Sequence, residues 1–104
     1  MAALLDQVGI VHESQKQVDW TAVDEFLPKH KLVLQVDGIY WHALARVKHR
    51  DRAQNATCIR QGYSVVRIDE FYLYEKGKRA VQEAVRLGKS ATIPRAFRLA
   101  LPQP

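Results

Sequence analysis

The sequence has 104 residues, of which 47% are hydrophobic and 26% are charged, proportions that are ordinary for one globular domain with a single core. Its net charge of +5 favours a polyanionic partner, nucleic acid first. A membrane span is excluded because no apolar run is long enough, and the single cysteine, Cys58, excludes an internal disulfide and a zinc site built on several thiolates.

The first predicted element is the end of a helix at residues 1–9. Leucine and valine recur there at helical spacing, and Gly9 is suited to terminate the helix. Residues 10–17 are a connection that becomes a strand. We expect one domain over residues 1–104, with a core at about 4–88, in a reducing, cytoplasmic setting.

Two strands joined by a short turn follow. Residues 18–26 alternate between apolar and polar side chains, and residues 31–37 alternate again. The turn between them contains Pro28, whose ring presets φ, so we expect the two strands to pair as an antiparallel hairpin. This hairpin would bring the neighbourhood of Asp19 close to that of Asp37, although the alternation alone leaves the register open.

A long helix and a third strand come next. Residues 43–61 carry an apolar stripe at helical spacing, and Gly62 is expected to end this helix. Residues 63–68 are predicted to be a strand, and a strand that follows a strand and a helix favours a parallel crossover. The other helix faces are rich in cations, which are usually only solvated but also suit contact with DNA phosphates. The candidate DNA contacts are Arg46, Lys48, Arg50 and Arg52 on the helix and Arg67 on the strand.

The last third of the chain is predicted to hold one more helix. Residues 69–76 are expected to be a polar, aromatic connection, and residues 78–87 an amphipathic helix that Gly88 ends. Residues 89–104 show no hydrophobic period and are expected to form a surface tail. The elements together predict an α/β fold with a central mixed sheet, built from an antiparallel hairpin and a strand joined by a crossover helix, and flanked by helices.

The stretch with the most chemical content is the end of the second hairpin strand. Asp37 and Gly38 close the strand, and His42 follows five residues after the acid. A core strand that ends in an Asp-Gly turn is the simpler interpretation. Together with Asp19 and Asp51, however, these side chains offer hard oxygen ligands for a divalent cation, and a histidine that takes a proton from water near neutral pH.

Each of these residues also has a purely structural interpretation. Asp19 is consistent with a surface acid on an edge strand. His42 suits a residue at a helix N-terminus that packs on Trp41, and Asp51 suits a helix-surface acid beside arginines. The residue pattern by itself leaves both interpretations open.

Several runs of residues resemble one family of endonucleases. They are Val36-Asp-Gly-Ile-Tyr-Trp-His42, Arg50-Asp-Arg52 and Gly62-Tyr-Ser-Val-Val-Arg-Ile-Asp-Glu70, with Val18-Asp-Trp20 upstream in the place of the family's P-D-F strand. They resemble the very-short-patch-repair (Vsr-like) endonucleases and the related small uncharacterised endonuclease-like domains of the PD-(D/E)XK superfamily. The resemblance spans residues from about 4 to 72.

The resemblance implies a restriction-endonuclease-like fold and a cut in DNA that depends on Mg²⁺ or Mn²⁺. It implies that Asp19 is the metal-ligating aspartate and that the backbone carbonyl of Val36 completes the metal site. It also implies that His42 serves the attacking water and that Asp51 is its paired acid. Asp37 stands where the repair enzymes have another histidine and where the wider superfamily has its lysine.

The sequence departs from the family at two positions. Gln35 stands where related domains have a glutamate, so we expect it to be a weaker metal ligand. Ile39 stands where the repair enzymes have a zinc-binding cysteine, so no structural zinc is expected. Three functions are consistent with the sequence: a metal-dependent DNA endonuclease, a catalytically inactive nucleic-acid-binding module on the same fold, and a protein-interaction domain. A partner subunit or a homodimer would add selectivity for DNA.

Overall fold

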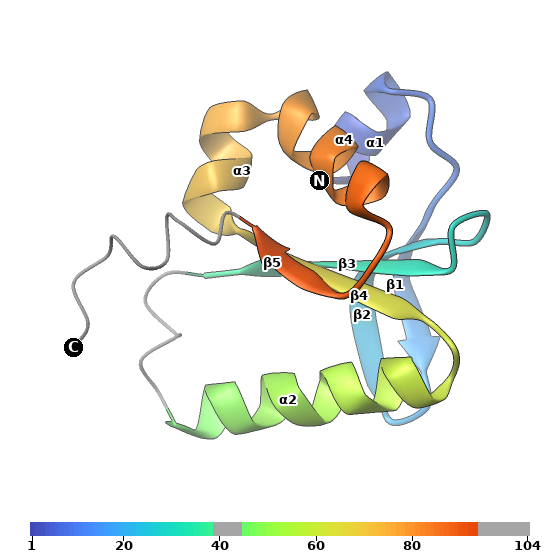
Figure 1. The fold of residues 1–104 in the computed structure, drawn as a ribbon, viewed down its shortest axis with the longest axis vertical. Coiled ribbons are helices and arrows are strands. Elements are labelled where there is room, and N and C mark those ends of the chain that lie inside the picture. Colours follow the sequence, from blue (N-terminus) through green and yellow to red (C-terminus); the bar gives the residue numbers. More distant parts are fainter. Residues whose placement is uncertain (39–44, 94–104) are drawn as a thin grey trace.

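The computed structural model describes residues 1–38 and 45–93, with the backbone alone described at residues 45–47. Its elements in chain order are α1 (Ala2–Gln7), β1 (Glu13–Val18), β2 (Thr21–Leu27), β3 (Leu32–Asp37), α2 (Ala45–Arg60), β4 (Ser64–Asp69), α3 (Glu70–Lys76), α4 (Lys78–Leu87) and β5 (Ala91–Ile93). The strands form one sheet in the order β1-β2-β3-β4-β5, in which β1, β2 and β3 are antiparallel and β3, β4 and β5 are parallel (Figure 1). The expected hairpin and the expected crossover helix are both confirmed.

The helices cover the two faces of the sheet unequally. Helices α1, α3 and α4 lie over one face, whereas α2 lies over the other (Figure 1). Helix α2 connects the end of β3 to the start of β4. Its N-terminal half therefore lies close to the C-terminal ends of these two parallel strands. In the described part of the chain, none of the helices combines the length and apolar content needed to cross a membrane.

The face under α1, α3 and α4 is packed with aliphatic side chains. Alternate residues of the two central strands, Leu32 and Leu34 on β3 and Val66 and Ile68 on β4, point to this face and are fully buried. Burying each such side chain contributes about 1.5–3 kcal/mol. The buried cluster is completed by Leu5, Leu27, Ala80, Val81, Ala84 and Ile93.

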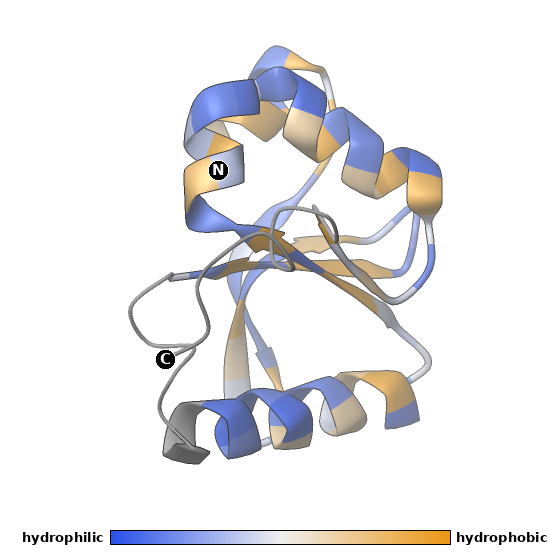
Figure 2. Cartoon of the chain, turned by 60° about the vertical axis from the view of Figure 1, so that its left-hand side comes forward, coloured by the Kyte–Doolittle hydropathy of each residue, from blue (hydrophilic) through white to orange (hydrophobic). Residues whose placement is uncertain are grey.

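The face under α2 has a smaller apolar cluster. Its buried members are Val18, Val23, Phe26, Val33, Cys58 and Val65. Among the described residues, only Cys58 brings α2 into this cluster, and burial raises the pKa of its thiol. Helix α2 is hydrophilic along most of its described length and becomes hydrophobic near its C-terminal end (Figure 2). The middle of α2, residues 51–55, is held to the sheet by polar contacts.

The predicted strand over residues 18–26 is wrong at its start, because the chain turns there. Val18 ends β1 and pairs with Thr21 at the start of β2, so Asp19 and Trp20 form the hairpin turn. Asp19 has a φ of 54°, a left-handed conformation that aspartate tolerates better than most residues. The apolar alternation continues across this turn, which is why it resembles a single strand.

Two further elements were not predicted. Residues 70–76, expected to be a connection, form α3, which begins where the side chain of Asp69 accepts a hydrogen bond of 2.9 Å from the backbone N–H of Phe71. Residues 91–93, expected to belong to a surface tail, form β5 and pair with β4. The remainder of that tail, residues 94–104, lies outside the described residues, as does the predicted start of the long helix at residues 43–44.

Candidate active site

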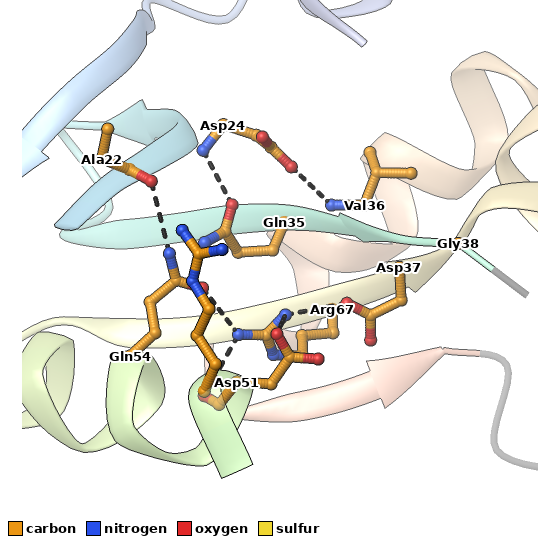
Figure 3. Close-up of a pocket in the computed structure, with 10 residues that line it drawn as sticks. Ala22, Asp24, Gln35, Val36, Asp37, Gly38, Asp51, Gln54 and Arg67 are labelled. Atoms are coloured by element: carbon orange, nitrogen blue, oxygen red, sulfur yellow. Dashed lines mark hydrogen bonds and ion pairs between the residues drawn. The ribbon is translucent and has the colours of Figure 1, made fainter. Parts of the chain in front are cut away.

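A cavity of about 340 Å³ opens between α2 and the adjoining ends of β2, β3 and β4 (Figure 3). Most of its lining is polar, and several charged side chains face one another across it. The lining residues are Ala22, Asp24, Gln35, Val36, Asp37, Gly38, Arg50, Asp51, Gln54 and Arg67. The cavity therefore combines carboxylates, amides and guanidinium groups in one place.

One wall of the cavity forms where side chains connect β2 to β3. The paired backbones run from Leu27 opposite Leu32 to Glu25 opposite Leu34. Next to that pair, the backbone N–H of Asp24 donates to Gln35 Oε1 at 2.7 Å, and the backbone N–H of Val36 donates to Asp24 Oδ2 at 2.8 Å (Figure 3). The two side chains thus satisfy backbone donors of the neighbouring strand and border a polar gap between the strands.

Besides the carboxylate of Asp24, the backbone carbonyl oxygen of Val36 also faces this gap. In an antiparallel pair, the N–H and the C=O of one residue point toward the same neighbouring strand. Because the Val36 N–H points to Asp24, the Val36 carbonyl also faces β2. The other oxygen of Asp24, Oδ1, has no hydrogen-bond partner among the described residues. A carboxylate and a carbonyl are therefore available side by side.

The opposite wall is organised by Arg67, which lies on β4 opposite Gln35 and is 7% exposed. Its Nη1 donates to Asp37 Oδ1 at 2.8 Å and lies 3.6 Å from Asp51 Oδ1. Its Nη2 donates to Gln54 Oε1 at 2.9 Å and to the Asp51 carbonyl at 3.3 Å, while Nε donates to Asn55 at 2.9 Å. One guanidinium thus ties β3 to α2 across the floor of the cavity (Figure 3).

The structure brings together four of the catalytic and metal-binding groups predicted from sequence. Asp37, Asp51, Gln35 and Val36 all line the cavity. Asp19 does not, because it lies exposed in the turn between β1 and β2, where its carbonyl accepts a hydrogen bond of 2.7 Å from Gln17.

The predicted DNA contacts fall into two groups. Lys48, Arg50 and Arg52 are exposed on α2, and Arg50 also lines the cavity. Arg67 does not fit the role of a surface phosphate contact, because its guanidinium is buried and bound by carboxylate, amide and carbonyl oxygens. His42 lies outside the described residues, and so does the side chain of Arg46.

Asp24 is the carboxylate in the cavity that the sequence pattern missed. The register of the hairpin is the signal that could have identified Asp24. Counting equal numbers of residues outward from the Leu27–Leu32 pair places Asp24, and not Asp19, opposite Gln35. The resemblance to the P-D-F strand pointed instead to the acid before Trp20, which the structure places in the turn.

The oxygen atoms in the cavity suit a hard divalent cation only as a partial set of ligands, with the remaining coordination positions left to water and substrate. Among the described residues, no three His, Cys, Asp or Glu side chains converge to hold a metal ion. Magnesium in proteins, however, usually keeps several waters and binds through one or two carboxylates and substrate phosphates. The carboxylate of Asp24 beside the Val36 carbonyl fits that mode of binding.

No protein-family model and no curated protein matches the sequence. A solved structure does match: the catalytic domain of the homing endonuclease I-Bth0305I is 26% identical to this chain. The match covers 86% of this chain and 92% of that domain, with a TM-score of 0.63. The chain therefore has the fold of a restriction-endonuclease-like catalytic domain, a mixed five-stranded sheet flanked by helices.

Proposed function

We propose that this protein is a metal-dependent endonuclease that hydrolyses phosphodiester bonds in DNA. The observation that carries the proposal is the polar gap between β2 and β3, where Asp24 and the Val36 backbone face one cavity. The likeness to a homing endonuclease catalytic domain supports it, and so does the net charge of +5. The relationship to the Vsr-like branch is part of this proposal.

Asp24 and the Val36 carbonyl would hold Mg²⁺ or Mn²⁺, and Gln35 would be a weaker ligand because its amide oxygen already accepts from the backbone of Asp24. A cation held there would polarise the scissile phosphate and lower the pKa of water. Asp24 takes here the role that the sequence pattern had suggested for Asp19. A carboxylate fixed by a backbone N–H is held ready for this role without reorganisation.

The other cavity residues orient groups around the reacting phosphate. Arg67 holds Asp37 and Asp51 in position through its contacts to both. In this proposal His42 takes the proton of the attacking water, and Asp51 orients that histidine. Arg50 at the rim, with its exposed neighbours on α2, contacts the phosphates on either side of the cut. These contacts position the backbone and do not read bases.

The proposal is tested by comparing Asp24→Asn with Asp19→Asn in a plasmid-cleavage assay. Native protein should nick or linearise the plasmid with Mg²⁺ or Mn²⁺, and a chelator should stop the reaction. Asp24→Asn should lower the rate at least about 100-fold, since roughly 3 kcal/mol of transition-state stabilisation corresponds to that factor. Asp19→Asn should retain the native rate. Equal loss in both variants would exclude the assignment of Asp24.

A catalytically inactive nucleic-acid-binding module on the same fold is the second candidate. Two observations favour it: Gln35 is a neutral residue whose oxygen is engaged by Asp24, and Asp37 is ion-paired with Arg67. This candidate predicts salt-dependent binding to duplex DNA with no cleavage at any concentration of Mg²⁺ or Mn²⁺. Cleavage that depends on Asp24 would exclude it.

A further inference from the structure

A second cavity lies away from α2, between α3 and α4. Its volume is about 500 Å³, and it is lined by Tyr72, Lys76, Arg79, Gln82, Glu83 and Arg86. Helices α3 and α4 cover the face of the sheet opposite α2 (Figure 1), so this α3–α4 cleft is separate from the candidate active site. None of its lining residues belongs to that site.

Three cations of the α3–α4 cleft have no acidic partner. Lys76, Arg79 and Arg86 are exposed, and no carboxylate lies within 4.0 Å of their charged nitrogens among the described residues. The acid in the cleft, Glu83, instead accepts a hydrogen bond of 2.7 Å from the hydroxyl of Tyr72. This hydrogen bond to a carboxylate raises the pKa of Tyr72, so the hydroxyl remains a donor at neutral pH.

Like charges gathered in a concave cleft concentrate positive potential and attract anions. The formal balance of the lining is three cations against one carboxylate, whose charge is partly satisfied by Tyr72. A phosphate group, with several acceptor oxygens, matches arginine and lysine donors converging from two helices. The chemistry of the cleft therefore favours a phosphate ligand.

The position of the cleft favours nucleic acid as the source of that phosphate. Helix α3 begins directly after β4, the strand that carries Arg67, and its seven residues span roughly 10 Å. The cleft is thus within reach of a nucleic acid bound at the active site.

We infer that the α3–α4 cleft binds backbone phosphates of DNA outside the cleavage site. The inference rests on the proposed function for the identity of the polyanion. A second phosphate contact on the far face would orient the duplex relative to the cavity without contributing to the chemistry.

The test compares two variants that lose the same charge. One is K76Q/R79Q/R86Q in the cleft, and the matched control is K29Q/K31Q/K89Q, whose three lysines are exposed elsewhere. Binding of a fluorescent duplex is measured by anisotropy at several salt concentrations, with a chelator present to prevent cleavage. The cleft variant should reduce the slope of log K against log salt by about two to three, since each lost phosphate contact removes about 0.9. Equal slopes for the cleft variant and the control would overturn the inference.

Two further arms separate this inference from its alternatives. In the first, binding of the same variants to vesicles of anionic phospholipid is measured. If the cleft variant loses vesicle binding while its slope of log K against log salt for DNA is unchanged, the inference is overturned in favour of a lipid surface. Asp19→Asn, which changes an exposed carboxylate outside the cavity, should keep the native DNA slope. If native protein binds DNA through the cleft but cleaves nothing, the proposed endonuclease activity fails while the phosphate cleft stands.

Discussion

The two faces of the sheet are held by different forces. Under α1, α3 and α4 the contacts are aliphatic, and most of the fully buried large side chains of the described residues lie there. Under the middle of α2 the contacts are a buried arginine, two carboxylates and side-chain amides. Apolar burial is non-directional and tolerates small shifts, whereas a polar network requires fixed geometry. The apolar face therefore stabilises the fold, and the polar face defines the candidate site.

The largest expected effect on stability comes from removing one partner of the buried ion pair between Arg67 and Asp37. Arg67→Leu removes the guanidinium that lies 2.8 Å from the buried Asp37 carboxylate and should lower the free energy of unfolding by about 3–5 kcal/mol. The double variant Arg67→Leu/Asp37→Leu should recover most of that loss, because the buried carboxylate is removed together with the cation. Urea denaturation measures both. A single variant as stable as the native protein would show that the network does not hold α2.

The apolar face should respond more simply. Leu34 is fully buried in the cluster under α1, α3 and α4, so Leu34→Ala should cost about 2–5 kcal/mol through lost burial and a residual cavity. Ile59 on α2 is 53% exposed, and Ile59→Ala serves as the control, with an expected change within about 0.5 kcal/mol. Similar losses of stability in the two variants would contradict the conclusion that the apolar face under α1, α3 and α4 stabilises the fold.

A smaller effect is expected where the two kinds of contact meet. Thr57 is buried on α2, and its hydroxyl accepts from the indole N–H of Trp20 at 2.8 Å. Thr57→Val keeps the shape but removes this acceptor, and should cost about 1 kcal/mol. Tryptophan fluorescence reports the change, because Trp20 loses its anchor on α2. An unchanged unfolding midpoint and spectrum would show that this hydrogen bond is dispensable.

The smallest effect concerns the rim of the apolar face, where α1 meets the hairpin. His12 lies 2.7 Å from both Asp6 and Glu25, and the hydrogen bond to Asp6, then that to Glu25, raises its pKa above the ordinary 6.5. A raised folded-state pKa contributes stability that is fully present below about pH 6.5 and is lost as the pH rises through the folded-state value. Relative to His12→Gln, the native protein should gain stability on acidification from pH 8.5 to 6. A difference between the two that does not vary with pH would contradict this.

The sequence predicted the elements whose signal is local. Strand β3, strand β4 and helix α4 lie within one residue of their predicted bounds, because alternation and helical spacing reflect which side chains are buried. Helix α3 was missed although its signals were local: an acid able to cap it at Asp69 and Gly77 at its end. Strand β5 was missed because its three residues are strand only through pairing with β4.

The site was predicted in part. Val36 and Asp37 line the cavity because they lie at the end of a strand, and Asp51 lines it because it lies in the N-terminal half of the helix that follows; the chain order already defines these positions. Asp24 and Arg67 depend on neighbours far away in sequence. Asp24 faces Gln35 through the register of the hairpin, and Arg67 reaches Asp37 across a parallel pair separated by a whole helix.

The amino-acid order by itself determined the α/β class, the crossover helix and the basic character, since each depends on periodicity or composition. The tertiary structure alone decided which aspartate faces the cavity, and that a buried arginine forms its floor. The physical reason is that strand register and buried ion pairs depend on distances between residues far apart in sequence, which no local pattern encodes.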